Sequence, residues 1–182
     1  QVTDEMRSAA KTVNFGIIYG ISDFGLAKQL SVKKSEAAKF IERYFAKHQG
    51  VQTFINKTIE DARENEHVTT LLGRKRPMPD INSPHGGLRA SAERMAINTP
   101  VQGSAADMIK VAMVRINDKL QASNYKCRMI LQVHDELVFE CPPEELEAVK
   151  KVVVEEMEKA LPLKVPVKVD VGWGKSWAEA KG

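Results

Sequence analysis

Four side chains that suit a phosphate-bearing ring compound recur every four residues near the start of the chain. They are Arg7, Lys11, Phe15 and Tyr19. Because successive residues of an α-helix are rotated by about 100°, residues four apart lie on one stripe of the helix. Cations bind phosphate, and aromatic rings pack against a base or a sugar. The stripe therefore suits a nucleoside triphosphate. Spacing alone favours the alternative, a helix whose aromatic rings pack in the core while Arg7 and Lys11 face solvent.

A second stripe of polar residues at the same spacing suits a nucleic-acid groove. Arg94, Asn98 and Gln102 are again four apart, and they flank apolar residues that would face a core. Side chains of this kind can bind the acceptors of the minor groove or sugar atoms. Gln102 has a structural alternative, because Thr99-Pro100-Val101-Gln102 matches a capping box with proline at the first helical position.

Charged residues also gather at two predicted hairpins. His134, Asp135 and Glu136 lie at a turn between the apolar strands of residues 127–141, where a carboxylate could bind Mg²⁺. The alternative is an ordinary polar turn, in which Asp is common. Arg74 and Arg76 lie in a small basic hairpin, where they either contact backbone phosphate or are simply solvated.

Three segments of the chain resemble motifs of family A DNA polymerases, the bacterial polymerase I type. The fingers helix of that family is similar to RSAAKTVNFGIIYG at residues 7–20. Its third polymerase motif is similar to LQVHDELVFE at 131–140, and the segment between the two is similar to ERMAINTPVQGSAAD at 93–107. The terminal string GWGKSW at 172–177 also resembles the end of the family's polymerase domain.

The resemblance implies roles for the first stripe. Arg7 and Lys11 hold the incoming deoxynucleoside triphosphate, and Lys11 counts among the catalytic residues. Phe15 packs beside the sugar, and phenylalanine there goes with discrimination against dideoxynucleotides, whereas tyrosine goes with their acceptance. Tyr19 occupies or guards the template-base position. The glycines that follow Phe15 and Tyr19 let the backbone approach the nascent base pair.

The resemblance also implies a DNA site and a metal site. Primer-template DNA would contact Arg94, Asn98 and Gln102, with the basic hairpin touching phosphates and His134 lying against the primer terminus. Asp135 would be a carboxylate ligand of two catalytic Mg²⁺ ions, and Glu136 an auxiliary acid.

The family's other aspartate lies in a DYSQIELR-like string, which the sequence does not contain. We therefore expect the chain to be a fragment that does not extend primers alone. Its expected partner is a separate N-terminal portion that holds the thumb and the first palm strand. Without that strand, the palm sheet should have an unpaired edge and exposed apolar surface.

The patterns predict an α+β fold, and the resemblance implies that residues 1–85 form the fingers and residues 86–182 the C-terminal part of the palm. Thr3 caps a helix that ends at Gly20, a short helix covers 22–30, Ser35 caps one that stops at Gly50, and another covers 51–65. After the basic hairpin, two helices cover 88–98 and 100–122 and are separated at Pro100. The hairpin at 127–141, a helix at 143–161 and a strand at 165–171 complete the prediction.

Composition places few limits on function. The net charge is +3, and the two cysteines, Cys127 and Cys141, lack metal-ligand spacing. No apolar run approaches the roughly 18 residues of a membrane span, so we expect a cytoplasmic protein. The resemblance implies a role in DNA replication or repair. Two alternatives stay open: a fragment of a single-subunit RNA polymerase, and a non-catalytic DNA-binding remnant.

Overall fold

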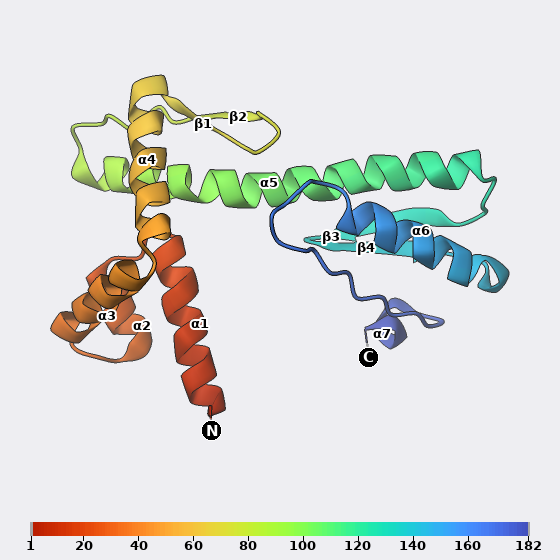
Figure 1. Cartoon of the computed structure of the whole chain (residues 1–182), viewed down its shortest axis with the longest axis horizontal. Helices are drawn as coiled ribbons and strands as arrows, with labels where there is room; N and C mark the ends of the chain where they lie inside the picture. Colours follow the sequence, from red (N-terminus) through yellow and green to blue (C-terminus); the bar gives the residue numbers. More distant parts are fainter. Residues whose placement is uncertain (1, 182) are drawn as a thin grey trace. The chain divides into compact units, whose positions relative to one another are not determined.

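The computed structural model describes residues 2–181, and the chain divides into two compact units at 1–103 and 104–182. Helices and two small antiparallel hairpins make the fold α+β, as the sequence predicts (Figure 1). Within the described residues, no helix combines the length and the apolarity that a membrane span requires.

The first two helices begin and end as predicted. Helix α1 (Asp4–Ile18) is capped by Thr3, whose hydroxyl accepts a hydrogen bond from the Met6 amide at 3.2 Å. The chain leaves α1 through Gly20, which has a positive φ of 74°. Helix α2 (Asp23–Leu30) is capped by the Ser22 hydroxyl, which accepts from the Gly25 amide at 3.1 Å. Both caps satisfy amide groups that the helix itself leaves unpaired.

The predicted ends of the next helix are wrong. Helix α3 (Lys34–Lys47) begins one residue before Ser35, because Lys33 has the extended backbone of a cap residue, with φ −67° and ψ 145°. Gly50 does not stop α3, since it lies in the first turn of helix α4 (Gln49–Asn65) and lacks the positive φ of a glycine stop.

The basic hairpin is confirmed and packs on a long helix in the first unit. Strands β1 (His67–Thr69) and β2 (Lys75–Pro77) pair antiparallel. The Arg76 guanidinium donates to the Thr99 hydroxyl at 3.2 Å. A Cβ on Gly103 would lie 2.7 Å from the methyl group of Thr70, so only glycine lets the hairpin approach the helix this closely.

That helix, α5 (Gly86–Ala122), runs through Pro100, so the predicted break is wrong. Proline removes one backbone donor, which costs up to roughly 3 kcal/mol in a helix interior. Burial on both sides of it opposes this cost, since Ala96 and Ile97 precede it in the core and Ile109 and Ala112 follow it. The Thr99 hydroxyl also donates to the Met95 carbonyl oxygen at 2.7 Å.

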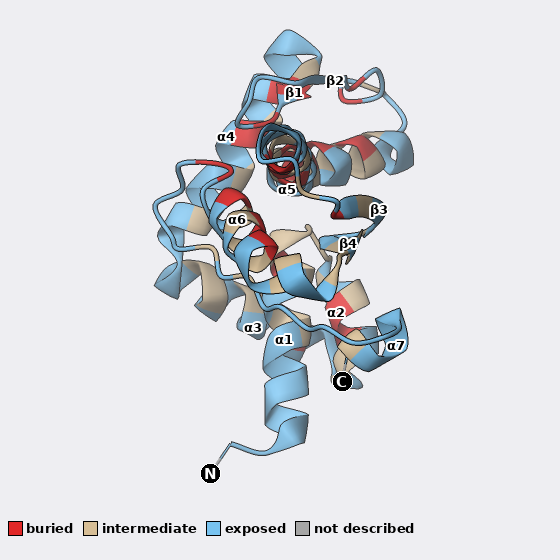
Figure 2. Ribbon diagram, turned by 90° about the vertical axis from the view of Figure 1, so that its right-hand side faces the viewer, coloured by how far each residue is buried: buried red, intermediate tan, exposed pale blue. Residues whose placement is uncertain are grey.

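The second unit packs a hairpin and a helix on the C-terminal part of α5. Strands β3 (Arg128–Val133) and β4 (Glu136–Glu140) pair antiparallel, with Val133 opposite Glu136. The 3₁₀ turn η1 (Pro143–Glu145) leads into α6 (Leu146–Glu158), and a short α7 (Trp177–Ala180) lies near the end of the chain. Figure 2 shows the buried face of α6, whose Val149 and Val153 pack in one cluster with Ile116 and Leu120.

Two predictions for this unit are wrong. Residues 165–171 form no strand, and the regular helix predicted at 143–161 is confined to 146–158. A strand needs a hydrogen-bonded neighbour, and among the described residues β3 and β4 pair only with each other. The side chains of Ile130 (58% exposed) and Leu131 (45% exposed) are left in solvent.

The two thiols should differ in reactivity. Burial, with a smaller contribution from the neighbouring Cys141 thiol, raises the pKa of Cys127 to about 12. Since the thiolate is the nucleophile, we expect iodoacetamide at pH 8 to alkylate Cys141, which is half-buried, well before Cys127. Peptide mass spectrometry over a time course measures both rates, with the chain in urea as the control in which they should converge. Equal rates in the folded chain would contradict the assigned burial.

Candidate nucleotide and DNA site

The predicted stripe on α1 is a continuous cation and aromatic surface. The Lys11 ammonium nitrogen lies 5.9 Å from the centroid of the Phe15 ring. The rings of Phe15 and Tyr19 stack, with centroids 6.1 Å apart and planes 17° apart. Arg7 is exposed one turn before Lys11. Charge and ring surface therefore follow one another along one face of the helix.

This face of α1 is not the core-packing face. Phe15 is 49% exposed, whereas Ile17 is the buried residue of the helix, at 2%. Leaving half of a phenylalanine in water forgoes part of the roughly 1.5–3 kcal/mol that its burial would contribute. In the described structure the Phe15 ring is therefore not packed in the core.

Gly20 brings the end of α1 against α5. A Cβ on Gly20 would lie 3.2 Å from Cγ of Arg94 and 3.5 Å from Cδ1 of Ile97. The C-terminal end of the first stripe, next to Tyr19, thus lies beside Arg94, the first residue of the second stripe. Gly16 is close to its own chain, because a Cβ there would lie 3.0 Å from the Ile21 side chain.

The second stripe presents polar groups beside this junction. Arg94 and Gln102 are exposed on α5, and Asn98 between them is half-buried. The side-chain oxygen of Asn98 is buried without a hydrogen-bond partner among the described residues. Gln102 does not serve as part of a capping box, because Thr99 lies inside the helix rather than at its start. A buried acceptor without a partner is costly, and such groups are common where a ligand donates.

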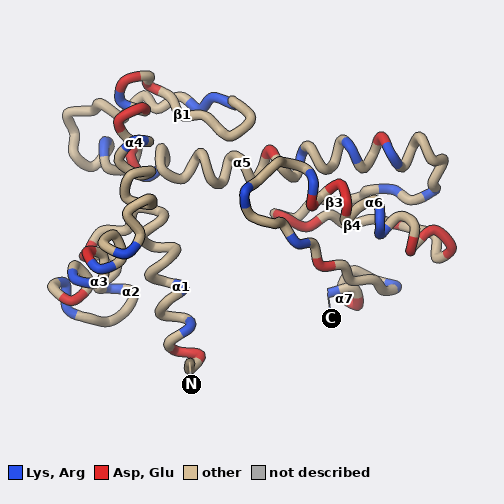
Figure 3. Tube along the Cα trace, viewed as in Figure 1, with Lys and Arg blue, Asp and Glu red and all other residues tan. Residues whose placement is uncertain are grey.

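The basic hairpin is only partly available for phosphate. The Arg76 guanidinium donates to Thr99 and to the sulfur of Met95 at 3.6 Å, which orients it toward α5. Arg74 is exposed, and its backbone amide donates to the Thr70 hydroxyl at 3.1 Å. Figure 3 shows the cations grouped on this hairpin, where Lys75 lies between the two arginines.

The predicted catalytic hairpin has a two-residue turn formed by His134 and Asp135. His134 has a positive φ of 54°, a conformation that type I′ and II′ hairpin turns require at this position and that non-glycine residues rarely adopt. The turn leaves Asp135 and Glu136 exposed side by side, and the Glu136 carboxylate lies 3.0 Å from the Lys181 ammonium. Strain at such a tip is typical of functional sites.

These carboxylates suit part of a Mg²⁺ site. Mg²⁺ binds one or two protein carboxylates and completes its shell with water and phosphate oxygens. Asp135 and Glu136 supply this donor type at an accessible tip, whereas the described residues contain no group of three or more potential metal ligands. The pair therefore fits a site that is completed by substrate oxygens and by a further carboxylate.

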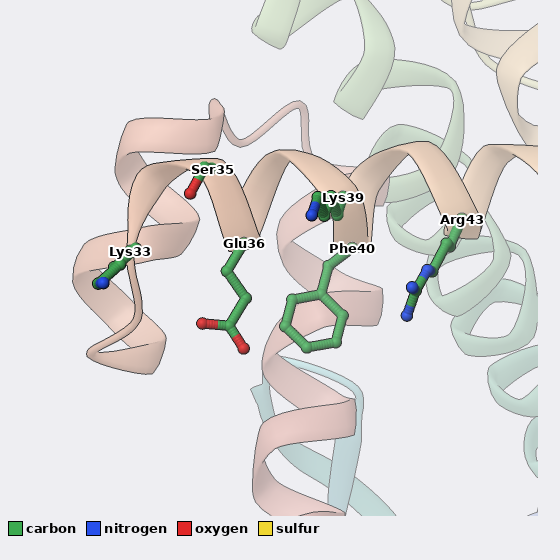
Figure 4. A pocket seen from close by; sticks show the side chains of 6 residues that line it. All are labelled: Lys33, Ser35, Glu36, Lys39, Phe40 and Arg43. Atoms are coloured by element: carbon green, nitrogen blue, oxygen red, sulfur yellow. The ribbon is translucent and has the colours of Figure 1, made fainter.

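A hollow and one partner of a contact, Lys181, lie outside the residues that the sequence singles out. The hollow, of about 350 Å³, lies on α3 and is lined by Lys33, Ser35, Glu36, Lys39, Phe40 and Arg43 (Figure 4). None of the predicted site residues lines it. The contact is that of Lys181 with Glu136, whose partners are too far apart in sequence for any local spacing to reveal.

Comparisons with known proteins identify the class. The family model for DNA polymerase family A matches residues 1–179. The DNA polymerases I of Bacillus caldotenax and Bacillus subtilis are 51% and 50% identical to the chain over 181 residues. In both cases all of this chain is covered but only 21% of the relative, so the chain spans about a fifth of the length of these proteins.

A solved structure shares the fold as well. The POL domain of Pol1 from M. smegmatis, in complex with DNA primer-template and dNTP, superposes with a TM-score of 0.96 at 41% identity. It is matched over 100% of this chain and 32% of its own length. The chain belongs to DNA polymerase family A.

Gly20 offers a test of the junction between α1 and α5. We expect Gly20→Ala to lower the free energy of unfolding by about 1–2 kcal/mol, because a residue with a side chain resists a positive φ. The methyl group would also press on Arg94. Gly50→Ala is the matched control, since a Cβ at that position would have nothing within 4 Å and no loss is expected. Urea denaturation measures the free energy of unfolding of both variants. Equal values for the two would show that Gly20 is not required at the junction of α1 and α5.

Proposed function

We propose that this chain forms the fingers (1–85) and the C-terminal part of the palm (86–182) of a DNA polymerase. The reaction is template-directed transfer of a deoxynucleotide to a primer 3′-OH. The observation that carries the proposal is the continuous face of Lys11, Phe15 and Tyr19 along α1 and its C-cap, with Lys11 and Phe15 exposed, in a chain of this family. The complex of the structural neighbour with DNA primer-template and dNTP supports the same assignment.

The face on α1 binds the incoming nucleotide. Arg7 and Lys11 neutralise the triphosphate through charge-assisted hydrogen bonds, each worth about 1.5–3 kcal/mol. Phe15 is half-exposed and stacked on Tyr19, so it can lie beside the sugar without leaving a core. Tyr19, at the end of the helix, then occupies the position of the template base.

The polar stripe of α5 binds the duplex near the primer end. Arg94 lies against Gly20, next to the nucleotide face, and Gln102 is exposed two turns further along. The buried oxygen of Asn98 is an acceptor without a partner among the described residues, which a donor of the DNA or a bound water would satisfy. Arg74 and Arg76 add positive charge for the backbone phosphates.

The tip of the β3–β4 hairpin holds the metal ligand. Asp135 is an exposed carboxylate at this strained turn, where it would ligate catalytic Mg²⁺ with Glu136 as an auxiliary acid and His134 against the primer terminus. When bound, two Mg²⁺ ions would neutralise charge on the phosphates and hold the attacking and leaving oxygens.

A further polymerase segment is proposed to complete the palm. Among the described residues β3 and β4 pair only with each other, and Ile130 and Leu131 of β3 are exposed apolar residues. An unpaired sheet edge accepts another strand through main-chain hydrogen bonds. A strand from the N-terminal polymerase portion, carrying the second aspartate, would cover this surface and complete the metal site.

The proposal predicts that the purified chain of 182 residues does not extend a primer, because Asp135 alone cannot fix two ions. A chimera of the Bacillus subtilis enzyme in which this chain replaces the matching segment should be active. Extension of a labelled primer, followed on a gel, measures the activity of the isolated chain and of the chimera. Robust Mg²⁺-dependent extension by the chain alone would contradict the incomplete site, and an inactive but folded chimera would support a non-catalytic remnant. Extension with ribonucleotides would favour an RNA polymerase.

Asp135→Ala in the active chimera tests the metal ligand. We expect chemistry to be abolished while primer-template affinity stays nearly unchanged, since duplex affinity comes mainly from phosphate contacts. Single-turnover extension and fluorescence anisotropy measure the two quantities separately. A variant that binds DNA poorly yet extends bound primer at the normal rate would refute the assignment. Asp118→Ala, an exposed aspartate on α5, is the matched control.

Phe15→Tyr tests the placement of Phe15 beside the sugar. A dideoxynucleotide lacks the 3′-OH, and the added hydroxyl of tyrosine can replace that polar group. We expect the chimera variant to lose most of its preference for deoxy over dideoxy substrates, with normal extension nearly unchanged. Because Phe15 is 49% exposed, the new hydroxyl can reach solvent and the melting temperature should not fall. An unchanged preference for deoxy over dideoxy substrates would contradict the proposed position of Phe15 beside the sugar.

A further inference from the structure

The C-terminal segment of the second unit is held in place by close backbone packing. A Cβ on Gly172 would overlap the carbonyl oxygen of Ala180, and one on Gly174 would lie 2.6 Å from Cβ of Glu179. Residues 172–174 therefore lie directly against α7, and only glycine fits at these two positions.

Reciprocal hydrogen bonds fix the start of α7. The Ser176 hydroxyl accepts from the Glu179 amide at 3.4 Å, and the Glu179 carboxylate accepts from the Lys175 amide at 2.9 Å. The first of these bonds is that of an N-cap residue, and the second ties the residue before the cap to the same helix, so that both stabilise the first turn. The Lys181 amide closes the last turn by donating to the Trp177 carbonyl oxygen at 3.2 Å.

This packing places the Lys181 ammonium at the tip of the β3–β4 hairpin. Its nitrogen lies 3.0 Å from the Glu136 carboxylate and 4.8 Å from the centroid of the Trp177 ring. Both charged side chains are about half-exposed, so the ion pair contributes little to stability. Its consequence is positional, because it holds the carboxylate that adjoins Asp135.

We propose that Lys181 is a positioning residue that binds Glu136 and thereby sets how strongly the hairpin tip binds a multivalent cation. An ammonium 3.0 Å from a carboxylate occupies the place that a metal ion would take on the same oxygen. While Lys181 holds Glu136, Asp135 is the carboxylate left open to a metal ion. The inference rests on the proposed function of Asp135 as the metal ligand.

Binding of Tb³⁺ tests the inference on the full chain without any polymerase activity. Tb³⁺ binds carboxylate oxygens, and its luminescence is sensitised by nearby tryptophan, which Trp177 provides. We expect Lys181→Ala to bind Tb³⁺ more tightly, by up to about fivefold, because Glu136 would no longer exchange an exposed ion pair worth at most about 1 kcal/mol for the metal ion. Lys181→Arg should keep the affinity of the unaltered chain. Lys175→Ala is the matched control, since it removes an exposed lysine from the same segment without touching Glu136.

A double-variant cycle shows whether Lys181 acts through Glu136. In a Glu136→Gln background, Lys181→Ala should leave Tb³⁺ affinity nearly unchanged. An equal gain with and without Glu136, or no gain in Lys181→Ala itself, would overturn the inference. Melting temperatures of the variants show whether the segment stays folded. Asp135→Ala tests the underlying proposal separately, because its sensitised luminescence should be lost in every background. If that variant still binds while the Lys181 effect persists, the metal-ligand assignment fails and the positioning role stands.

Discussion

Close approach of backbone to helix α5 is the constraint on which the first unit depends. Ala92 and Ala96 have no exposed surface, and Gly20 and Gly103 lie where a Cβ would press on a neighbouring side chain. Small residues at these four positions let the end of α1 and the β1–β2 hairpin reach the same helix. Because interiors are close-packed, a larger residue at any of them would displace a neighbouring element rather than fill a void.

That packing supports groups which do not contribute to stability themselves. Phe15 is half-exposed, the Asn98 oxygen is buried without a partner among the described residues, and His134 has a positive φ. Each costs free energy that an apolar or unstrained alternative would avoid. All three lie within the segments that resemble polymerase motifs, where the proposed nucleotide, DNA and metal sites would use them.

The second unit shows the same principle at a sheet edge. The β3–β4 hairpin packs through its own residues against α5 and α6, yet it ends in an open edge with exposed apolar neighbours. Residues 165–171 have the alternation of a strand without the partner that would make them one. An isolated hairpin of two strands is only marginally stable in water. The covering strand that we propose would therefore add both stability and a carboxylate to this unit.

The sequence by itself determined the α+β class, the two hairpins, the cap of α1, and the stripes of residues four apart, because these follow from local backbone preferences and helical period. It also determined the family, through strings long enough to be specific. Only the tertiary structure decided that α5 continues through Pro100, since burial on both sides of the proline outweighs its local preference. It likewise decided that 165–171 is not a strand and that Phe15 faces solvent. The contact between Lys181 and Glu136 joins residues far apart in the chain, and no local pattern encodes the fold that brings them together.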